Sequence, residues 1–150
     1  MPVTENKVVI LDFNRTLYDP DSGSLVTDAC LVLRELSSRG HVLCLLSRRE
    51  GGRDELVDSL GIRDYFSKVY FVDRKSVASF ETVLDEHNAC AAASFVVGDY
   101  VPDEIAFGNA VGMTTIWARW GKFSDVPPTL PHQRPDYVVG NLRGVLEIIS

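Results

Sequence analysis

Short, uniformly apolar segments alternate along this chain with amphipathic segments, and this alternation constrains the fold more than any other feature. The apolar segments are typical of buried strands, and the amphipathic segments are typical of helices that cover a core. A strand whose side chains are apolar on both faces must be covered on both faces, as in parallel sheets with helical crossovers. The sequence therefore predicts an α/β fold, a three-layer α/β/α Rossmann-like structure with a doubly wound, mostly parallel sheet.

The element boundaries follow from the apolar pattern and from the glycines that end helices. We expect strands at residues 7–12, 41–47, 68–72, 94–98, 114–118 and 137–139, and helices at residues 25–39, 53–60, 76–87, 102–111 and 142–149. No internal repeat or second domain is evident, so residues 1–150 are expected to form a single domain. The proline-rich connection at residues 119–135 is interpreted as a surface crossover, although connections of this length are often functional or bind partners.

Composition and charge narrow the classes of function. The formal net charge is −6, which argues against general binding to nucleic acids or anionic membranes. No apolar run approaches the roughly 20 residues of a membrane span, and residues 1–7 lack a signal-peptide core, so we expect a cytoplasmic protein. Cys30, Cys44 and Cys90 are odd in number and far apart, which predicts small buried thiols rather than disulfides or a zinc site.

The most informative motif lies at the end of the first predicted strand. The apolar run at residues 8–11 ends at Asp12, and a short polar loop with Asn14 and Thr16 follows. Residues just past the carboxyl end of a strand in such a sheet face the ligand crevice. A carboxylate there can bind a cation or attack an electrophile, whereas a helix cap or turn residue is the structural alternative.

Polar clusters follow four of the predicted strands: residues 12–16, Ser47, residues 73–76 and residues 99–104. Because the carboxyl ends of parallel strands lie along one edge of a sheet, we expect these clusters to converge on one crevice. The carboxylates of the last cluster are hard oxygen ligands of the kind that Mg²⁺ prefers.

In this order, the four clusters resemble the four motifs of the haloacid dehalogenase superfamily of aspartate-nucleophile phosphohydrolases. The family's first motif is Asp-x-Asp-x-Thr, which Asp12, Asn14 and Thr16 match with one departure. The resemblance implies a haloacid-dehalogenase-like (HAD-like) fold and a Mg²⁺-dependent phosphohydrolase that acts through an aspartyl-phosphate intermediate. A carboxylate nucleophile divides one difficult displacement into two easier ones.

The resemblance also implies roles for individual residues. The implied catalytic residues are Asp12, Asn14, Ser47 and Lys75, and the implied substrate-binding residues are Asp12, Phe13, Asn14, Thr16, Ser47, Arg48 and Lys75. Asp12 is the nucleophile, Ser47 hydrogen-bonds a phosphoryl oxygen, and Lys75, with Arg74 as its competitor, neutralises charge. Thr16 is expected to hydrogen-bond within the nucleophile loop, and Asn109 to help orient that loop.

The metal ligands implied by the resemblance are Asp12, the carbonyl oxygen of Asn14, Asp99, and either Asp103 or Glu104. The spacing after Asp99 fits both of the last two acids. We favour Asp103 because its side chain is shorter, with Glu104 close behind. At least one of the two is expected to be a first-turn acid that the helix macrodipole favours.

Two residues of the first motif depart from the family. Asn14 stands where family phosphatases have the aspartate that protonates the leaving oxygen and later activates water, and an amide cannot exchange a proton at neutral pH. General acid–base catalysis contributes about 10²–10⁴ in rate, so we expect slow turnover or, alternatively, a catalytically impaired protein that binds phosphate or a partner. Arg15 replaces the usual glycine, and it either reaches the phosphate or points to solvent.

The spacing leaves no room for a cap domain, since only residues 18–24 separate the first motif from the next predicted helix. Capless members of the family act on large or exposed substrates or oligomerise to cover the site. We expect a small-molecule or exposed phosphate ester as substrate and allow for a homo-oligomer. The acids at residues 19 and 21 would repel anionic substrates, and Arg48, Arg49, Arg53 and Arg119 would oppose that effect.

Two other classes of protein fit less well. A phospho-accepting receiver domain has its acidic pair after the first strand and its phospho-acceptor after the third, whereas the acids here follow the first and fourth predicted strands. A dehalogenase needs no metal, and the acids around Glu104 argue against that activity.

Overall fold

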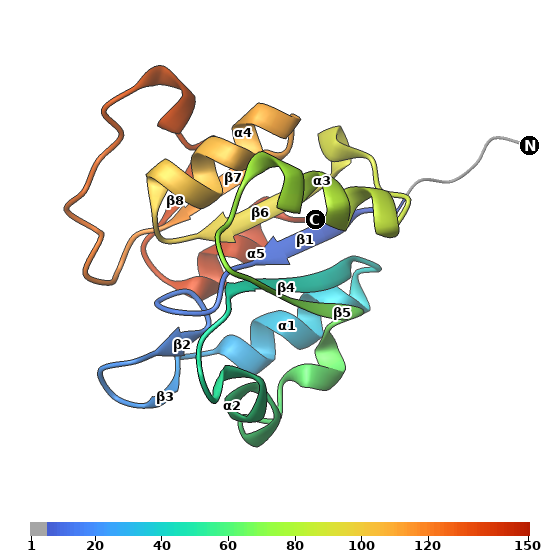
Figure 1. Ribbon diagram of the computed structural model, residues 1–150, viewed down its shortest axis with the longest axis vertical. Coiled ribbons are helices and arrows are strands. Elements are labelled where there is room, and N and C mark those ends of the chain that lie inside the picture. Colours follow the sequence, from blue (N-terminus) through green and yellow to red (C-terminus); the bar gives the residue numbers. More distant parts are fainter. Residues whose placement is uncertain (1–5) are drawn as a thin grey trace, which may run out of the picture.

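The computed structural model describes residues 6–150, so part of the segment predicted to lack a signal-peptide core, residues 1–5, lies outside the described residues. Six parallel strands form one sheet in the order β5-β4-β1-β6-β7-β8 (Figure 1). These strands are β1 (Val8–Leu11), β4 (Val42–Arg48), β5 (Lys68–Val72), β6 (Phe95–Gly98), β7 (Thr114–Ala118) and β8 (Tyr137–Val139).

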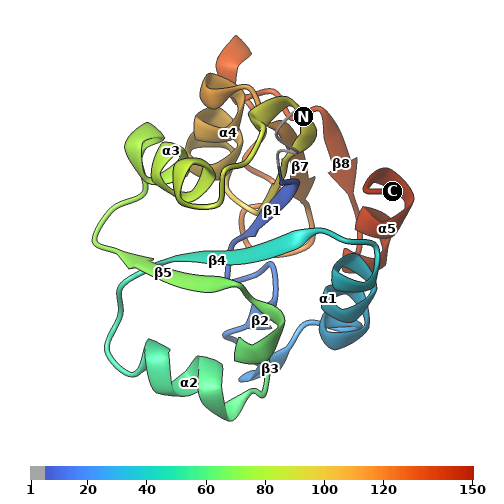
Figure 2. The same cartoon turned by 90° about the vertical axis from the view of Figure 1, so that its right-hand side faces the viewer.

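Helices cover both faces of the sheet, as predicted (Figure 2). One face packs against α1 (Ala29–Ser38), α2 (Arg53–Ser59) and α5 (Val145–Ile148), and the other against α3 (Val77–Glu86) and α4 (Ala106–Val111). The alternation along β1 shows why the strands are apolar throughout. Val9 and Leu11 pack in the core on the side of α1, α2 and α5, and Val8 and Ile10 pack in the core on the side of α3 and α4. Every position of the strand is therefore buried.

The position of β1 explains where a site can form. From β1 the chain first builds β4 and β5 on one side and then crosses back to build β6, β7 and β8 on the other. The strand order therefore reverses between β1 and β6, and ligands of doubly wound sheets bind at such a point, beyond the carboxyl ends of the strands. Leu11 pairs with Leu45 of β4 and Val97 of β6, so the polar residues that follow these three strands lie along the same edge of the sheet.

The prediction that a helix begins at residue 25 is wrong. Residues after the first motif form an antiparallel hairpin of β2 (Tyr18–Asp19) and β3 (Ser24–Leu25), and α1 begins only at residue 29. Gly23 has a φ of 71°, and the Asp19 carboxylate accepts a hydrogen bond from the backbone N–H of Asp21, at 2.9 Å, so the turn is closed by local contacts. Strands of two residues are too short to produce a recognisable alternation.

The short helices differ from the prediction in type rather than in place. The segment predicted as a helix at residues 102–111 begins with a π-helical turn, η3 (Val101–Ile105), before α4. The terminal helix begins with a 3₁₀ turn, η5 (Leu142–Gly144). Further 3₁₀ turns are η1 (Arg63–Tyr65), η2 (Ala91–Ala93) and η4 (Pro131–Gln133).

Asn109 holds the proline-rich connection in place. Its side-chain amide donates hydrogen bonds to the carbonyl oxygens of His132 and Arg134, at 2.9 and 2.8 Å, and its oxygen accepts one from the Thr115 hydroxyl at 2.9 Å. The prediction that Asn109 orients the nucleophile loop is not supported, because its side-chain hydrogen bonds go to this connection and to β7.

Two predictions from composition can be compared with the described part of the chain. No helix of residues 6–150 is long and apolar enough to cross a membrane. Cys30, Cys44 and Cys90 are free cysteines, but only Cys44 is buried, so the prediction of buried thiols is wrong for Cys30 and Cys90, which are partly exposed. The Cys44 thiol lies 3.5 Å from a ring nitrogen of His87.

Candidate active site

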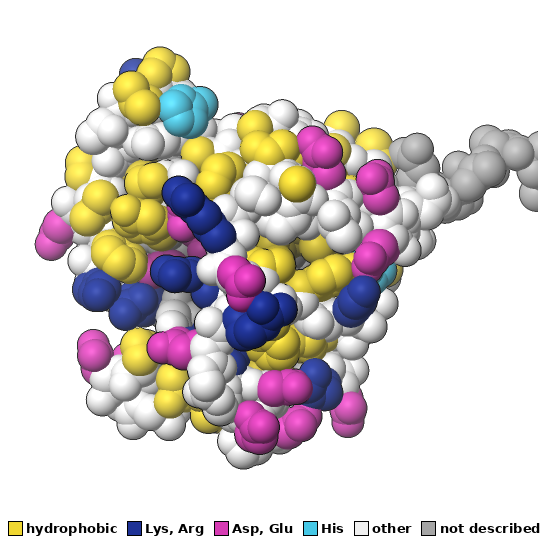
Figure 3. Space-filling model, in the orientation of Figure 1, with side chains coloured by type: hydrophobic (Ala, Val, Ile, Leu, Met, Phe, Trp, Pro, Cys, Tyr) yellow, Lys and Arg dark blue, Asp and Glu magenta, His cyan; other side chains and the backbone are white. Residues whose placement is uncertain are grey.

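A cavity of about 540 Å³ opens at the carboxyl edge of the sheet. Its walls come from the loops after β1, β4, β5 and β6 and from the connection after β7; they contain Asp12, Asn14, Arg15, Ser47, Arg48, Arg49, Glu50, Arg53, Lys75, Asp99, Tyr100, Asp103, Glu104, Lys122 and Phe123. Figure 3 shows Lys and Arg side chains gathered, with acidic ones among them, on the side to which the strand arrows of Figure 1 point. The four polar clusters of the sequence thus converge on one cavity.

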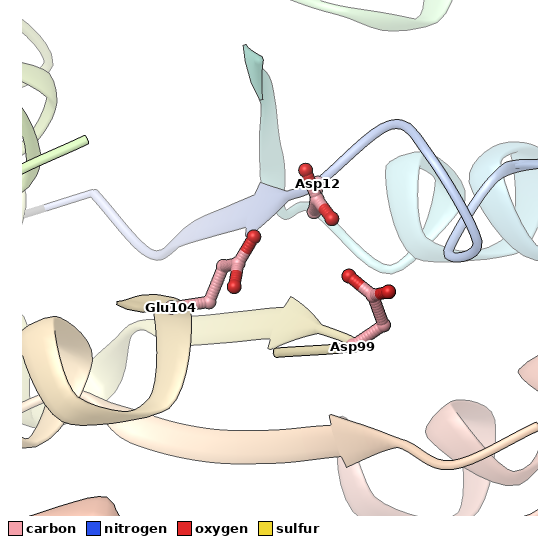
Figure 4. A group of neighbouring side chains, drawn as sticks. All are labelled: Asp12, Asp99 and Glu104. Carbon is pink, nitrogen blue, oxygen red and sulfur yellow. The ribbon is translucent and has the colours of Figure 1, made fainter. Parts of the chain in front are cut away.

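Three buried carboxylates form the floor of this cavity. Asp12 follows β1, Asp99 follows β6, and Glu104 lies in η3; one oxygen from each falls within 4.8 Å of the others (Figure 4). Within the described residues, Asp99 Oδ2 and Glu104 Oε2 are buried and have no hydrogen-bond partner. Buried carboxylate oxygens without partners are costly unless a cation or a proton satisfies them.

Lys75 is the counter-charge of this cluster. It is buried just before α3, and its Nζ lies 2.5 Å from Asp12 Oδ1 and 2.7 Å from Glu104 Oε1. The neighbouring Arg74 does not line the cavity, so the structure places Lys75 rather than its competitor among the carboxylates. One positive charge among three carboxylates leaves the floor with an excess of negative charge when all three are ionised.

The pKa values follow from this imbalance. Burial, together with the negative charge of Asp12, raises the pKa of Asp99 to about 9 and that of Glu104 to about 8. Burial alone would also raise the pKa of Asp12, but the charge of Lys75 and the hydrogen bond that it donates hold that pKa below its usual value. Burial opposes the charge of Lys75, yet Asp12 and Glu104 outweigh burial and raise the pKa of Lys75. Asp12 is therefore the ionised carboxylate, and the other two hold protons at neutral pH unless a cation replaces them.

The carboxylates fit a divalent cation with oxygen ligands. Mg²⁺ is usually bound by one or two protein carboxylates and keeps several waters, and the open cavity above the floor gives room for such waters. Within the described residues, one group of acidic, histidine or cysteine side chains lies close enough to share one ion, and it consists of Asp12, Asp99 and Glu104.

The preference for Asp103 over Glu104 is not supported by this arrangement. Glu104 is buried against the strand and faces Asp12, whereas Asp103 is half-buried in the cavity wall. Gly98, the last residue of β6, makes this possible, because a Cβ there would lie 2.5 Å from Glu104 Cγ. The wider π-helical turn brings residue 104, rather than residue 103, back over the strand.

Ser47 is held by an arginine that sequence reasoning named only as one of several cations near the site. Nη1 of the buried Arg53 donates a 2.6 Å hydrogen bond to Ser47 Oγ, and its Nη2 pairs with Glu50. The guanidinium lies 4.8 Å from the centroid of the Phe13 ring. Arg53 is the first residue of α2, and only the fold brings its side chain back over β4, so no local sequence pattern identifies it.

Two predicted substrate-binding side chains lie outside the cavity. Phe13 is fully buried in the core and stacks on Tyr18, with ring centroids 5.0 Å apart. Thr16 is also fully buried. It hydrogen-bonds within the nucleophile loop through its backbone N–H, which donates to the Phe13 carbonyl at 3.3 Å, whereas its hydroxyl has no hydrogen-bond partner among the described residues. The loop is closed instead by the backbone, where Leu17 and Tyr18 each donate to the Phe13 carbonyl at 3.0 Å.

Comparison with known families and curated proteins agrees with this site. A family model described as HAD-hydrolase-like matches residues 74–145, which include Lys75, Asp99 and Glu104. The glyceraldehyde 3-phosphate phosphatase of Pyrococcus furiosus is 27% identical over 101 residues, covering 64% of this chain and 42% of that relative. The chain thus spans less than half the length of this curated relative.

Solved structures share the fold at low identity. An uncharacterized protein from Listeria monocytogenes serotype 4b superposes with a TM-score of 0.80 at 22% identity, over 95% of this chain and 96% of that one. The HAD-hydrolase YfnB from Bacillus subtilis, solved with bound magnesium, gives 0.79 at 12% identity, over 98% and 100%. A HAD phosphatase from Thermococcus onnurineus gives 0.72 at 19% identity, over 84% and 58%. These likenesses establish the fold.

Proposed function

Because the chain belongs to the haloacid dehalogenase-like hydrolase superfamily, we propose that it is a Mg²⁺-dependent phosphohydrolase that acts through an aspartyl-phosphate on Asp12. The observation that carries this proposal is the buried carboxylate of Asp12, held 2.5 Å from Lys75 on the floor of an open cavity at the switch point of the sheet. A nucleophile needs this combination of a low pKa, a fixed position and access to substrate.

In the first step, an oxygen of Asp12 forms a bond to the phosphorus of a phosphate monoester, and the ester oxygen leaves with the electron pair of the broken P–O bond. Both reactants are anions, so positive charge must lie between them. Lys75 supplies one such charge, and the Ser47 hydroxyl, which accepts a hydrogen bond from Arg53, would donate a hydrogen bond to a phosphoryl oxygen. Mg²⁺, held by Asp12, Asp99, Glu104 and the carbonyl oxygen of Asn14, would supply the remaining charge neutralisation.

Asn14 determines how fast this cycle runs. It lines the cavity beside Asp12, but an amide neither protonates the leaving oxygen nor removes a proton from water. The protein should therefore accept phosphate from substrates with good leaving groups and release it slowly in the second step. The same substitution favours a second candidate function, a phosphate- or partner-binding protein of the same fold with little turnover.

The substrate class follows from access to the cavity. The segment between the first motif and α1 is the short hairpin, so the structure offers no cap over the cavity among residues 6–150. This supports a small or exposed phosphate ester as substrate, in line with the relative that is named as a glyceraldehyde 3-phosphate phosphatase. A cytoplasmic location, a single domain and a second copy that covers the open site remain proposals from the sequence.

The test is phosphate release from acetyl phosphate and an activated aryl phosphate, with Mg²⁺ and with EDTA, by the wild-type protein and Asp12→Asn. Release that requires Mg²⁺ and disappears in Asp12→Asn is expected. Release that persists in Asp12→Asn would contradict the proposal. Asn14→Asp separates the two candidates: a large gain in turnover indicates a slowed enzyme, and no activity in either form, with Mg²⁺ still bound, indicates the binding protein.

A further inference from the structure

Arg15 adopts a backbone conformation that non-glycine residues rarely take. Its φ is 62°, in the left-handed region. A residue with a side chain persists there only when surrounding contacts hold it, and such residues cluster at functional sites. What holds Arg15, and where its side chain goes, is therefore informative.

The connection after β7 guides the side chain of Arg15 along the cavity wall. Gly121 leaves space for it, since a Cβ at Gly121 would lie 3.0 Å from Arg15 Cβ and 3.1 Å from Arg15 Cδ. The guanidinium carbon then lies 5.3 Å from the centroid of the Phe123 ring, and Lys122 Nζ lies 5.0 Å from the same centroid. The Phe123 ring packs on Tyr100, with centroids 4.7 Å apart. One aromatic ring thus positions two cations in the wall of the cavity.

The charged groups of these two residues contact the Phe123 ring and no carboxylate at ion-pair distance within residues 6–150. Within residues 6–150, neither Arg15 nor Lys122 forms an ion pair, whereas Arg49 pairs with Asp73 and Arg53 with Glu50. The acids of the hairpin line an adjoining cavity of about 340 Å³ that shares Arg15 and Lys122 as walls, but they pair with neither cation. Two unpaired cations on a fixed platform are suited to binding an anion.

The transferred phosphoryl group already has its own partners in Lys75, Ser47 and the carboxylate floor. We propose that Arg15 and Lys122 bind a second anionic group, a carboxylate or another phosphate, on the leaving group of the substrate. This inference rests on the proposed phosphohydrolase function and specifies its substrate class. The protein should prefer phosphate esters that carry a negative charge at both ends.

The test compares two aryl phosphates, phenyl phosphate and para-carboxyphenyl phosphate, through the ratio of their kcat/KM values within each variant. The wild-type ratio should favour the carboxylated ester by about 10-fold or more, as a charge-assisted hydrogen bond contributes. Arg15→Gln and Lys122→Gln should bring the ratio towards one. Arg34→Gln, which removes an exposed arginine of α1 outside the cavity, is the matched control and should keep the wild-type ratio.

A wild-type ratio near one, or an equal loss on both esters in Arg15→Gln, would overturn the inference, since the second result places Arg15 on the phosphoryl group common to both. If the wild-type protein hydrolyses neither ester, calorimetry decides the inference alone; the proposed function fails only if acetyl phosphate is not hydrolysed either. Para-carboxyphenylphosphonate should bind more tightly than phenylphosphonate in the wild-type protein but not in Arg15→Gln; equal affinities in the wild-type protein would overturn the inference.

Discussion

Gly98→Ala tests how the carboxylate floor is built. The new Cβ would lie 2.5 Å from Glu104 Cγ, 2.6 Å from Glu104 Cβ and 3.0 Å from Glu104 Cδ. These distances are roughly 0.5–1 Å shorter than the ~3.5 Å at which carbon atoms pack. Because the clash reaches Glu104 Cβ, rotating the end of the side chain does not relieve it, and the π-helical turn must move. Overpacking of this kind costs about 1–3 kcal/mol of unfolding free energy.

The functional consequence is the displacement of one of the three carboxylates proposed to hold Mg²⁺. Even outer-shell changes at metal sites lower affinity by about 10–100-fold, so Gly98→Ala should weaken Mg²⁺ binding by at least that factor. Mg²⁺ affinity is measured by isothermal titration calorimetry, and stability by urea unfolding in EDTA.

Gly108→Ala is the matched control. There a Cβ would lie 2.5 Å from Val96 Cγ1 and 2.8 Å from Thr115 Cγ2, where α4 packs on the sheet away from the cavity. Gly108→Ala should therefore lose a similar amount of stability and keep its Mg²⁺ affinity. Wild-type affinity in Gly98→Ala, or an equal loss of affinity in Gly108→Ala, would refute the account of the floor.

Three further changes follow from the same geometry. Because the pKa values of Asp99 and Glu104 are raised, the folded, metal-free protein holds protons that the unfolded chain loses above about pH 4–5. Its melting temperature should therefore fall between about pH 5 and pH 9, and saturating Mg²⁺ should reduce this fall. A melting temperature that does not change with pH in EDTA would contradict this prediction. Lys75→Met breaks a buried ion pair and should lower the free energy of unfolding at neutral pH by about 3–5 kcal/mol, measured by urea unfolding. A loss of less than about 1 kcal/mol would show that the ion pair does not stabilise the fold. Arg53→Met leaves Ser47 without its charged donor and should lower kcat/KM by about 10-fold in a steady-state assay, and unchanged kinetics would show that Ser47 is positioned without it.

The strands were predictable because burial on both faces leaves a local signature. Strands at residues 68–72, 114–118 and 137–139 were placed without error, since each is bounded by polar residues or turns. The hairpin after the first motif was missed, because two-residue strands have no period to detect and depend on the contact of Tyr18 with Phe13. Local pattern therefore specifies the central sheet, and tertiary contacts specify the hairpin.

The site divides in the same way. Polar residues at the ends of parallel strands must share one edge, so the convergence of Asp12, Ser47 and Asp99 follows from topology. The choice between Asp103 and Glu104 depends on a π-helical turn and on the missing Cβ of Gly98, neither of which spacing alone reveals. Arg53 reaches Ser47 only because α2 folds back on the sheet.

The central claim is that Asp12 accepts a phosphoryl group and, because Asn14 cannot activate water, releases it slowly. The most direct measurement is intact-protein mass spectrometry after brief incubation with acetyl phosphate and Mg²⁺, with peptide mapping of the modified residue. The account predicts one added phosphoryl group, on Asp12, in the wild-type protein and much less in Asn14→Asp, where hydrolysis of the intermediate is faster. An unmodified wild-type protein that nevertheless releases phosphate, or a phosphoryl group on another residue, would contradict it.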